Sequence, residues 1–200
     1  MVAESRKPEV DRLVARAGVE AVELQDSVFR SIVDAETPQG IAAEIEIPAG
    51  PPPAGGSCVF LEGIQDAGNV GAIIRSAAAF GVGTVVLDNQ CADAWSPKTL
   101  RAGMGGHFAL CIRSVPGLRK ELETFPGRLL CTVARDGVTL SEADLAGRIG
   151  WVFGREGSGL SDASRENADA LVTIPLAAGI ESLNVAAAAA ICFYEGRRRT

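Results

Sequence analysis

Short apolar runs alternate with longer, alanine-rich stretches along most of the chain. The runs have the length of buried strands, and those in the second part of the chain are Cys58–Leu61, Val85–Leu87, Phe108–Ile112, Leu129–Val133, Ile149–Phe153 and Leu171–Ile174. The stretches between them carry the start and stop signals of helices. Strands that alternate with helices predict an α/β domain built on a parallel sheet.

Turn and capping residues place the helices of this domain. Asp66–Asn69 is a turn that can cap a helix over residues 70–80, which Gly81 ends. Ser96 and Pro97 are suited to the cap and the first position of a second helix. Further helices are expected over residues 116–123 and 162–167, and a brief helix or turn over residues 139–145.

A smaller α/β unit is expected ahead of this domain. Its elements are a charged helix over residues 4–18, a strand at Val19–Leu24, a helix at Val28–Val33 capped by Asp26 or Ser27, and a strand at Ile41–Ile47 with Ile45 and Ile47 facing inward. Residues 48–57, PAGPPPAGGS, form a linker, because prolines stiffen it and glycines free it. The chain is therefore divided into a unit over residues 1–50, a linker over 48–57 and a main domain over 57–200.

The last segment, residues 172–199, has the clearest pattern. A short strand stops at Pro175, a loop with Gly179 follows, and a helix begins after a polar group at Glu181–Asn184. The helix is apolar on every face from Val185 to Tyr194, which predicts burial on all sides, and Ser182 is a suitable N-cap. The polar group is either a set of satisfied caps or a binding site, since a helix N-terminus offers free backbone N–H groups.

Composition and charge narrow the class of protein. The chain has 200 residues, of which 47% are hydrophobic, and no apolar run is long enough to span a membrane. Its five cysteines have no metal-ligand spacing, so we expect reduced thiols in a cytoplasmic protein without a metal site. His107, the one histidine, is expected to have a structural role or to lie on the surface. Residues 1–74 carry a net charge of −7 and residues 75–200 a net charge of +1. Any nucleic-acid site should therefore lie in the second part.

Two further features are candidates for chemistry. Arg75 lies within an apolar helix, where it needs an ion-pair partner, a ligand or a solvated edge. The run Gly154-Arg155-Glu156-Gly157-Ser158-Gly159 follows a strand, and its glycines let backbone approach a ligand closely, although a plain turn is about as well supported. The run matches neither the dinucleotide fingerprint nor the P-loop, which disfavours a Rossmann-like dehydrogenase.

Three ordered motifs resemble one known family. They are Asn69-x-Gly71-x-x-x-Arg75, Phe153-Gly154-Arg155-Glu156-Gly157-Ser158-Gly159-Leu160, and Ile174-Pro175-Leu176 with Gly179 and Glu181-Ser182-Leu183-Asn184-Val185. Together they are similar to the motifs of the SpoU (TrmH-like) RNA ribose 2′-O-methyltransferases, over residues 57–200. The resemblance implies a parallel-sheet α/β fold with a deep C-terminal trefoil knot, and a homodimer formed through the knot region and the last helix. It also implies that residues 1–50 correspond to part of a substrate-recognition domain.

The resemblance also implies a reaction and a set of site residues. The expected activity is S-adenosylmethionine-dependent methylation of a ribose 2′-hydroxyl in ribosomal or transfer RNA. The implied catalytic set is Arg75, Asn69, Glu156, Ser182 and Asn184. The implied cofactor-binding set is Gly154, Arg155, Glu156, Gly159, Ile174, Leu176, Ser182 and Leu183. Arg155 stands where the family often has a small or amide residue, and we interpret it as a surface charge in preference to an RNA contact. A non-catalytic member that binds cofactor and RNA, and a base-methylating relative, are the alternatives.

Overall fold

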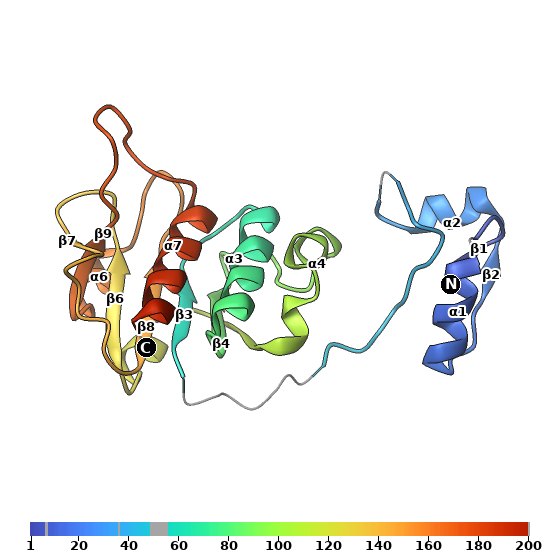
Figure 1. The fold of residues 1–200 in the computed structure, drawn as a ribbon, viewed down its shortest axis with the longest axis horizontal. Helices are drawn as coiled ribbons and strands as arrows, with labels where there is room; N and C mark the ends of the chain where they lie inside the picture. Colours follow the sequence, from blue (N-terminus) through green and yellow to red (C-terminus); the bar gives the residue numbers. More distant parts are fainter. Residues whose placement is uncertain (7, 36, 49–55, 200) are drawn as a thin grey trace. The chain divides into compact units, whose positions relative to one another are not determined.

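The computed structural model describes residues 1–6, 8–35, 37–48 and 56–199 (Figure 1). The chain divides into two compact units, Met1–Ile47 and Pro48–Thr200. Most of the expected linker, residues 49–55, lies outside the described residues.

The first unit is small and contains two helices and a short parallel pair of strands. Its elements are β1 (Val2–Ala3), α1 (Pro8–Ala17), β2 (Glu23–Leu24) and α2 (Asp26–Ile32). Val2, Val10 and Phe29 are buried between them. Gly18, with φ +64°, ends α1 as predicted.

Three predictions for this unit are wrong. Residues 41–47 form no strand: Ile41 makes a single antiparallel bridge to Val2, and Ile45 and Ile47 are 60% and 63% exposed. Alternation of polar and apolar residues favours a strand only where a second strand is available to pair with it. The strand expected at Val19–Leu24 is only two residues long. The N-cap residue of α2 is Gln25, and the Asp26 carboxylate accepts the Ser5 backbone N–H instead.

In the part of the second unit that the structure describes, seven strands form a parallel sheet with helices on both faces. Its elements in order are β3 (Cys58–Leu61), α3 (Ala67–Phe80), β4 (Thr84–Asp88), α4 (Pro97–Gly103), the 3₁₀ helix η1 (Gly106–Ala109), β5 (Cys111–Val115), α5 (Arg119–Glu123), β6 (Arg128–Thr132), β7 (Val138–Thr139), β8 (Ile149–Phe153), α6 (Asp162–Glu166), β9 (Ala170–Thr173) and α7 (Val185–Arg198). The predicted parallel α/β architecture is confirmed. The strand expected at Phe108–Ile112 starts three residues later, because residues 106–109 form η1.

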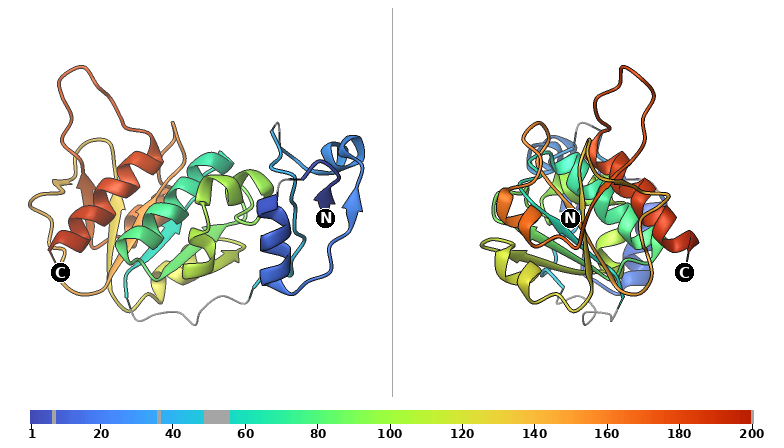
Figure 2. Two further views of the ribbon diagram at one scale, coloured as in Figure 1. Left: turned by 45° about the vertical axis from the view of Figure 1, so that its right-hand side comes forward. Right: turned by 90° about the vertical axis from the view of Figure 1, so that its left-hand side faces the viewer.

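Alternate residues of each strand pack on opposite faces of the sheet. Val59 and Leu61 of β3 belong to the core under α3 and α7, while Cys58 and Phe60 belong to the core under α5. The right-hand view of Figure 2 shows α3 and α7 on one side of the sheet and α5 and α6 on the other. The result is a three-layer domain with two apolar cores.

The strand order is β5-β4-β3-β8-β6-β9-β7. The strands β3, β4 and β5 follow one another toward one edge of the sheet, β6 begins the other half, and β8 lies between β3 and β6. In open parallel sheets, ligands bind beside the carboxyl ends of the strands where the order reverses. The loops that follow β6, β8 and β9 are therefore placed at the expected ligand-binding edge.

Close packing between α3 and α4 explains one motif glycine. A Cβ on Gly71 would lie 2.5 Å from both the Thr99 carbonyl oxygen and the Ala102 Cβ. A Cβ on Gly103 would lie 2.3 Å from His107, whose ring is buried and whose Nε2 lies 2.7 Å from the Ala94 carbonyl oxygen. His107 is thus a structural residue, one of the two expected alternatives.

The last helix differs from its prediction. Cys192 and Phe193 are buried, but the opposite face of α7 is open, with Ile191 39% exposed and Tyr194 55% exposed. The Tyr194 ring packs edge-on against Phe80 of α3, with ring centroids 5.8 Å apart. Burial on all sides is therefore wrong for the single chain, since α7 covers the outer surface of the sheet.

Candidate active site at the carboxyl ends of the strands

A cavity of about 660 Å³ opens beside the ends of β6, β8 and β9 and the start of α7. All eight residues of the predicted cofactor-binding set line it: Gly154, Arg155, Glu156, Gly159, Ile174, Leu176, Ser182 and Leu183. Of the predicted catalytic set, Glu156, Ser182 and Asn184 also line it. The loop after β8 and the loop before α7 thus form one wall, although some thirty positions of sequence separate their residues.

The loop after β8 needs glycine for a geometric reason. The backbone of Arg155 and Gly159 pairs in both directions, with N–H to oxygen distances of 3.1 and 2.8 Å. A Cβ on Gly154 would lie 2.4 Å from the Gly159 carbonyl carbon. Gly157 and Gly159 have φ values of +88° and +70°, which side chains disfavour. The glycine run therefore closes a tight loop, and the exposed Glu156 lies at its rim.

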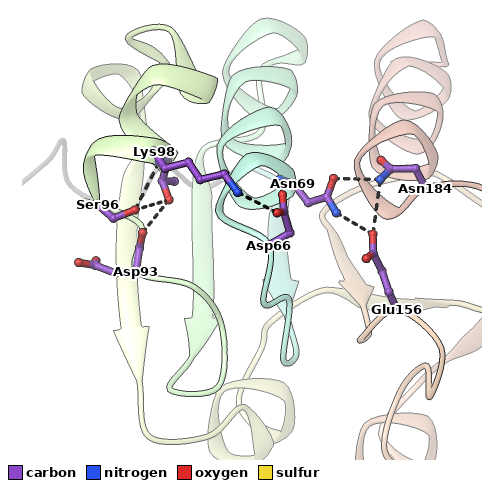
Figure 3. A network of polar contacts seen from close by, with 8 residues as sticks. Asp66, Asn69, Asp93, Ser96, Lys98, Glu156 and Asn184 are labelled. Atoms are coloured by element: carbon purple, nitrogen blue, oxygen red, sulfur yellow. Dashed lines mark hydrogen bonds and ion pairs between the residues drawn. The ribbon is translucent and has the colours of Figure 1, made fainter. Parts of the chain in front are cut away.

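Three side chains from the three motifs meet at the mouth of the cavity (Figure 3). Asn69 Nδ2 donates to Glu156 Oε1 at 2.6 Å, and Asn184 Nδ2 donates to Asn69 Oδ1 at 2.9 Å. A longer contact of 3.4 Å joins Asn184 Nδ2 to the same Glu156 oxygen. The sequence predicts that these residues share a site, but it does not reveal that they bond directly to one another.

Asn184 also caps α7. Its Oδ1 accepts the backbone N–H groups of Ala186 and Ala187, at 3.0 and 3.3 Å. The prediction of Ser182 as the cap is therefore wrong. Ser182 lies two residues before the cap, is exposed and lines the cavity.

Asn69 is held in place by the start of α3. The Asp66 carboxylate accepts the Asn69 backbone N–H at 2.9 Å and pairs with Lys98 at 3.1 Å. The Asn69 N–H, followed by Lys98, lowers the pKa of Asp66 below its ordinary value. Ser96 caps α4 and so fixes the backbone that carries Lys98 (Figure 3).

Arg75 is placed apart from this network. It lies on the exposed side of α3, outside the residues that line the cavity. Its side chain forms no hydrogen bond or ion pair with any residue that the structure describes. The sequence left three alternatives for this side chain: an ion-pair partner, a ligand or a solvated edge. In the single chain it lies at a solvated edge.

Sequence reasoning missed the cavity wall formed by Thr132–Arg135. They are the last residue of β6 and the loop after it, and β6 pairs with both β8 and β9. A strand's neighbours in a parallel sheet are not encoded locally, so this signal becomes visible only when the strand order is known. Among the described residues no group of three His, Cys, Asp or Glu side chains could hold a metal ion, and no helix is long and apolar enough to cross a membrane.

Comparisons with known proteins agree with the geometry. Residues 56–194 match the model of the SpoU rRNA Methylase family. The chain is 34% identical over 182 residues to RlmP of Bacillus subtilis, named as a 23S rRNA (guanosine(2553)-2′-O)-methyltransferase, and covers 73% of that protein with 90% of its own length.

Solved structures give the same result. A TrmH-family protein of Porphyromonas gingivalis, described as a putative RNA methyltransferase, is 36% identical, with a TM-score of 0.81 over 91% of this chain and 76% of its own. An AdoMet-bound rRNA methyltransferase of Sinorhizobium meliloti is 27% identical, with a TM-score of 0.78 over 96% of this chain and 78% of its own.

Proposed function

Because the chain belongs to the SpoU rRNA Methylase family, we propose that it transfers the methyl group of S-adenosylmethionine to the 2′-hydroxyl of a ribose in ribosomal or transfer RNA. The observation that carries the proposal is the meeting of Asn69, Glu156 and Asn184 at the mouth of one large cavity. The printed names of relatives, a 2′-O-methyltransferase and an AdoMet-bound enzyme, support the same reaction.

The cavity fits this cofactor. Its volume of about 660 Å³ lies within the usual range for small-molecule sites. Ile174, Leu176 and Leu183 offer apolar side chains and backbone groups for the adenine and methionine parts, and the bare Cα of Gly154 allows the loop to close beside them. When bound, S-adenosylmethionine supplies a methyl group activated by the sulfonium charge.

The chain's own residues position the RNA hydroxyl. The amide–carboxylate contacts fix Asn69 and Asn184 at the cavity mouth, and Ser182 offers a hydroxyl beside them. Arg75 would provide a fork of donors for the hydroxyl and the neighbouring phosphate, because a guanidinium keeps its protons and cannot serve as a base at ordinary pH. The hydroxyl proton would leave to water late in the transfer, and the cofactor would leave as the neutral thioether. An Arg75→Lys variant keeps the charge but loses the fork, so it should retain only part of the activity.

The position of Arg75 supports a homodimer in which a second copy brings this side chain to the cavity. The exposed side of α3 carries Arg75, and the open face of α7 carries Ile191 and Tyr194, as an interface would. The same proposal includes the C-terminal knot, supported by the return of α7 to the side of α3 after β9.

Mixing Arg75→Ala with Asn184→Ala chains tests whether the two copies of the homodimer share a site. Each mixed dimer has one intact site, so random mixing should restore about a quarter of the native activity, whereas none returns if each chain works alone.

The partner RNA is proposed to contact mainly residues 57–200, with the acidic residues 1–50 as a partial recognition unit that adds little affinity. Photo-crosslinking to RNA followed by peptide mapping tests this division, and crosslinks concentrated in residues 1–50 would contradict it. We place the reaction in the cytoplasm, where the five free cysteines stay reduced.

Methyl transfer itself is tested with tritium-methyl S-adenosylmethionine and total bacterial RNA, beside an Arg75→Ala variant. The native chain should label RNA, and the variant should bind the cofactor normally but label RNA at least a hundredfold more slowly. Cofactor binding without transfer by the native chain would favour a non-catalytic member. Absence of cofactor binding would contradict the proposal.

A further inference from the structure

Arg155 has a contact that the proposed reaction does not use. Its guanidinium Nη2 donates to Gln90 Oε1 at 2.6 Å, across 65 positions of sequence. The side chain is partly buried and passes over Gly63, where an added Cβ would lie 3.0 Å from Arg155 Nε. Arg155, interpreted from the sequence as a surface charge, also joins the loop after β8 to the loop after β4.

The backbone at the Gln90 end of this contact is held by hydrogen bonds, although the Gln90 side chain itself is exposed. Asp88, the last residue of β4, is only 6% exposed, and its Oδ1 accepts the backbone N–H groups of Gly63, Gln90 and Cys91 at 3.0–3.1 Å. The Cys91 sulfur accepts a hydrogen bond from the Ile64 N–H at 3.2 Å and donates one to the Leu61 carbonyl oxygen at 3.2 Å. The loops after β3 and β4 are thus tied together through partly or fully buried groups.

The Arg155 end is less well supported. Residues 156–159 are exposed, and two of the four are glycines with positive φ. The loop is closed by the backbone pairing of Arg155 with Gly159, and its next residue, Glu156, carries the contact to Asn69. Glycine-rich exposed loops have many accessible conformations, so a fixed support reduces the entropy lost when a ligand orders them.

We propose that the Gln90–Arg155 contact positions the loop of residues 154–159, and with it Glu156, for cofactor binding. Arg155 is a positioning residue in this account, not a catalytic one, because it acts through Gln90 and the loop backbone. The inference rests on the proposed function, in which this loop forms one wall of the S-adenosylmethionine site.

Arginine suits this position for a physical reason. Its planar guanidinium lies over Gly63 and donates one N–H to Gln90, a geometry that a lysine ammonium cannot reproduce. The glutamine partner is neutral, so this contact is a hydrogen bond and not an ion pair. The contact therefore adds support without adding a carboxylate near the Glu156 side chain.

The test compares S-adenosylmethionine binding, by titration calorimetry, across variants of the full chain. Arg155→Ala and Gln90→Ala should each raise the Kd about fivefold to tenfold, and the double variant should be no worse than either single one. Gln90→Glu keeps the acceptor oxygen and should bind within about twofold of the native chain. Arg119→Ala, which removes an exposed arginine paired with Glu123 on α5, is the matched control and should bind normally.

Hydrogen exchange supplies a second readout that does not depend on the cofactor. The amides of Arg155 and Gly159 should exchange faster in both alanine variants, while the amides of α3 and the thermal midpoint stay as in the native chain. Faster global unfolding in place of local exchange would contradict positioning and indicate a purely structural role.

The outcomes separate this inference from the proposed function. A native chain that fails to bind S-adenosylmethionine contradicts the proposed function and with it the positioning role. A native chain that binds normally, together with an impaired Arg155→Ala and an unimpaired Gln90→Ala, overturns the inference alone, because Arg155 would then contact a ligand directly.

Discussion

Asn184 has two roles that a pair of substitutions can separate. Its Oδ1 caps α7, and its Nδ2 donates to Asn69 and Glu156 at the cavity mouth. Asn184→Ala removes both roles. Asn184→Ser should keep the cap, because serine is as good an N-cap as asparagine and already caps α4 and α6 in this chain. The serine side chain carries no amide donor, so it removes only the second role.

The structure sets the expected magnitudes. Loss of the cap should destabilise Asn184→Ala by about 1 kcal/mol, or a fall in Tm of about 2–4 °C, while Asn184→Ser should unfold within about 0.5 kcal/mol of the native chain. Loss of the donated hydrogen bonds should lower kcat/KM by about tenfold to a hundredfold in both variants, since Asn69 and Glu156 each lose the contact from Asn184 and keep only their bond to one another.

The assays are urea unfolding followed by circular dichroism, and methyl transfer at varied RNA concentration. Equal losses of activity with unequal losses of stability are expected. If Asn184→Ser kept native activity while Asn184→Ala lost it, the network would have no catalytic role, and the cap alone would explain the asparagine.

Three further outcomes are expected. Glu156→Gln keeps an oxygen that can accept the Asn69 amide N–H, so its activity should stay within about threefold of the native chain if Glu156 acts by accepting this hydrogen bond. A loss of activity as large as that of Glu156→Ala would show that the negative charge of Glu156 is required. Gly154→Ala should abolish calorimetric cofactor binding, because its Cβ would overlap the Gly159 backbone; native affinity would rule out the tight loop. Burial lowers the pKa of His107, the chain's one histidine, below 6.5 in the folded chain. As the pH falls, the unfolded chain therefore takes up a proton on this histidine at a higher pH than the folded chain does. The free energy of unfolding should decrease as the pH drops from about 7 to 5. In a His107→Gln variant the free energy of unfolding should lose this dependence between pH 5 and 7, and an unchanged slope would contradict the assignment.

The sequence predicted those features of the main domain that depend on a single segment, namely helix ends and buried strands. Ser96 caps α4 and Gly81 ends α3 as predicted, because capping depends on a few neighbouring residues. The Asp66–Asn69 turn caps α3 through Asp66, so the helix starts at Ala67, three residues earlier than expected. The strand at Ile149–Phe153 was predicted to the residue, since a strand buried on both faces is a continuous apolar run.

Predictions failed where the outcome depends on a distant partner. Ile41–Ile47 alternates like a strand but has no second strand to pair with along its length. The apolar faces of α7 do not reveal that only one of them packs on the sheet. Gln90 and Arg155 meet only because β4, β3 and β8 are neighbours, an order that the sequence does not state.

The site was predicted through motif resemblance, and its geometry was not. The order of the motifs identified Asn69, Glu156 and Asn184 as one group, but the direct bonds between them and the separate position of Arg75 required coordinates. Their catalytic and cofactor-binding roles remain proposals.

The most direct test of the account is the position of the transferred methyl group. RNA labelled by the native chain with tritium-methyl S-adenosylmethionine is hydrolysed in alkali, which cleaves a phosphodiester only when the neighbouring 2′-hydroxyl is free. A ribose 2′-O-methyltransferase should leave the label in alkali-resistant dinucleotides, and the Arg75→Ala variant should leave almost none. Label recovered in mononucleotides would place the methyl on a base and contradict the central claim.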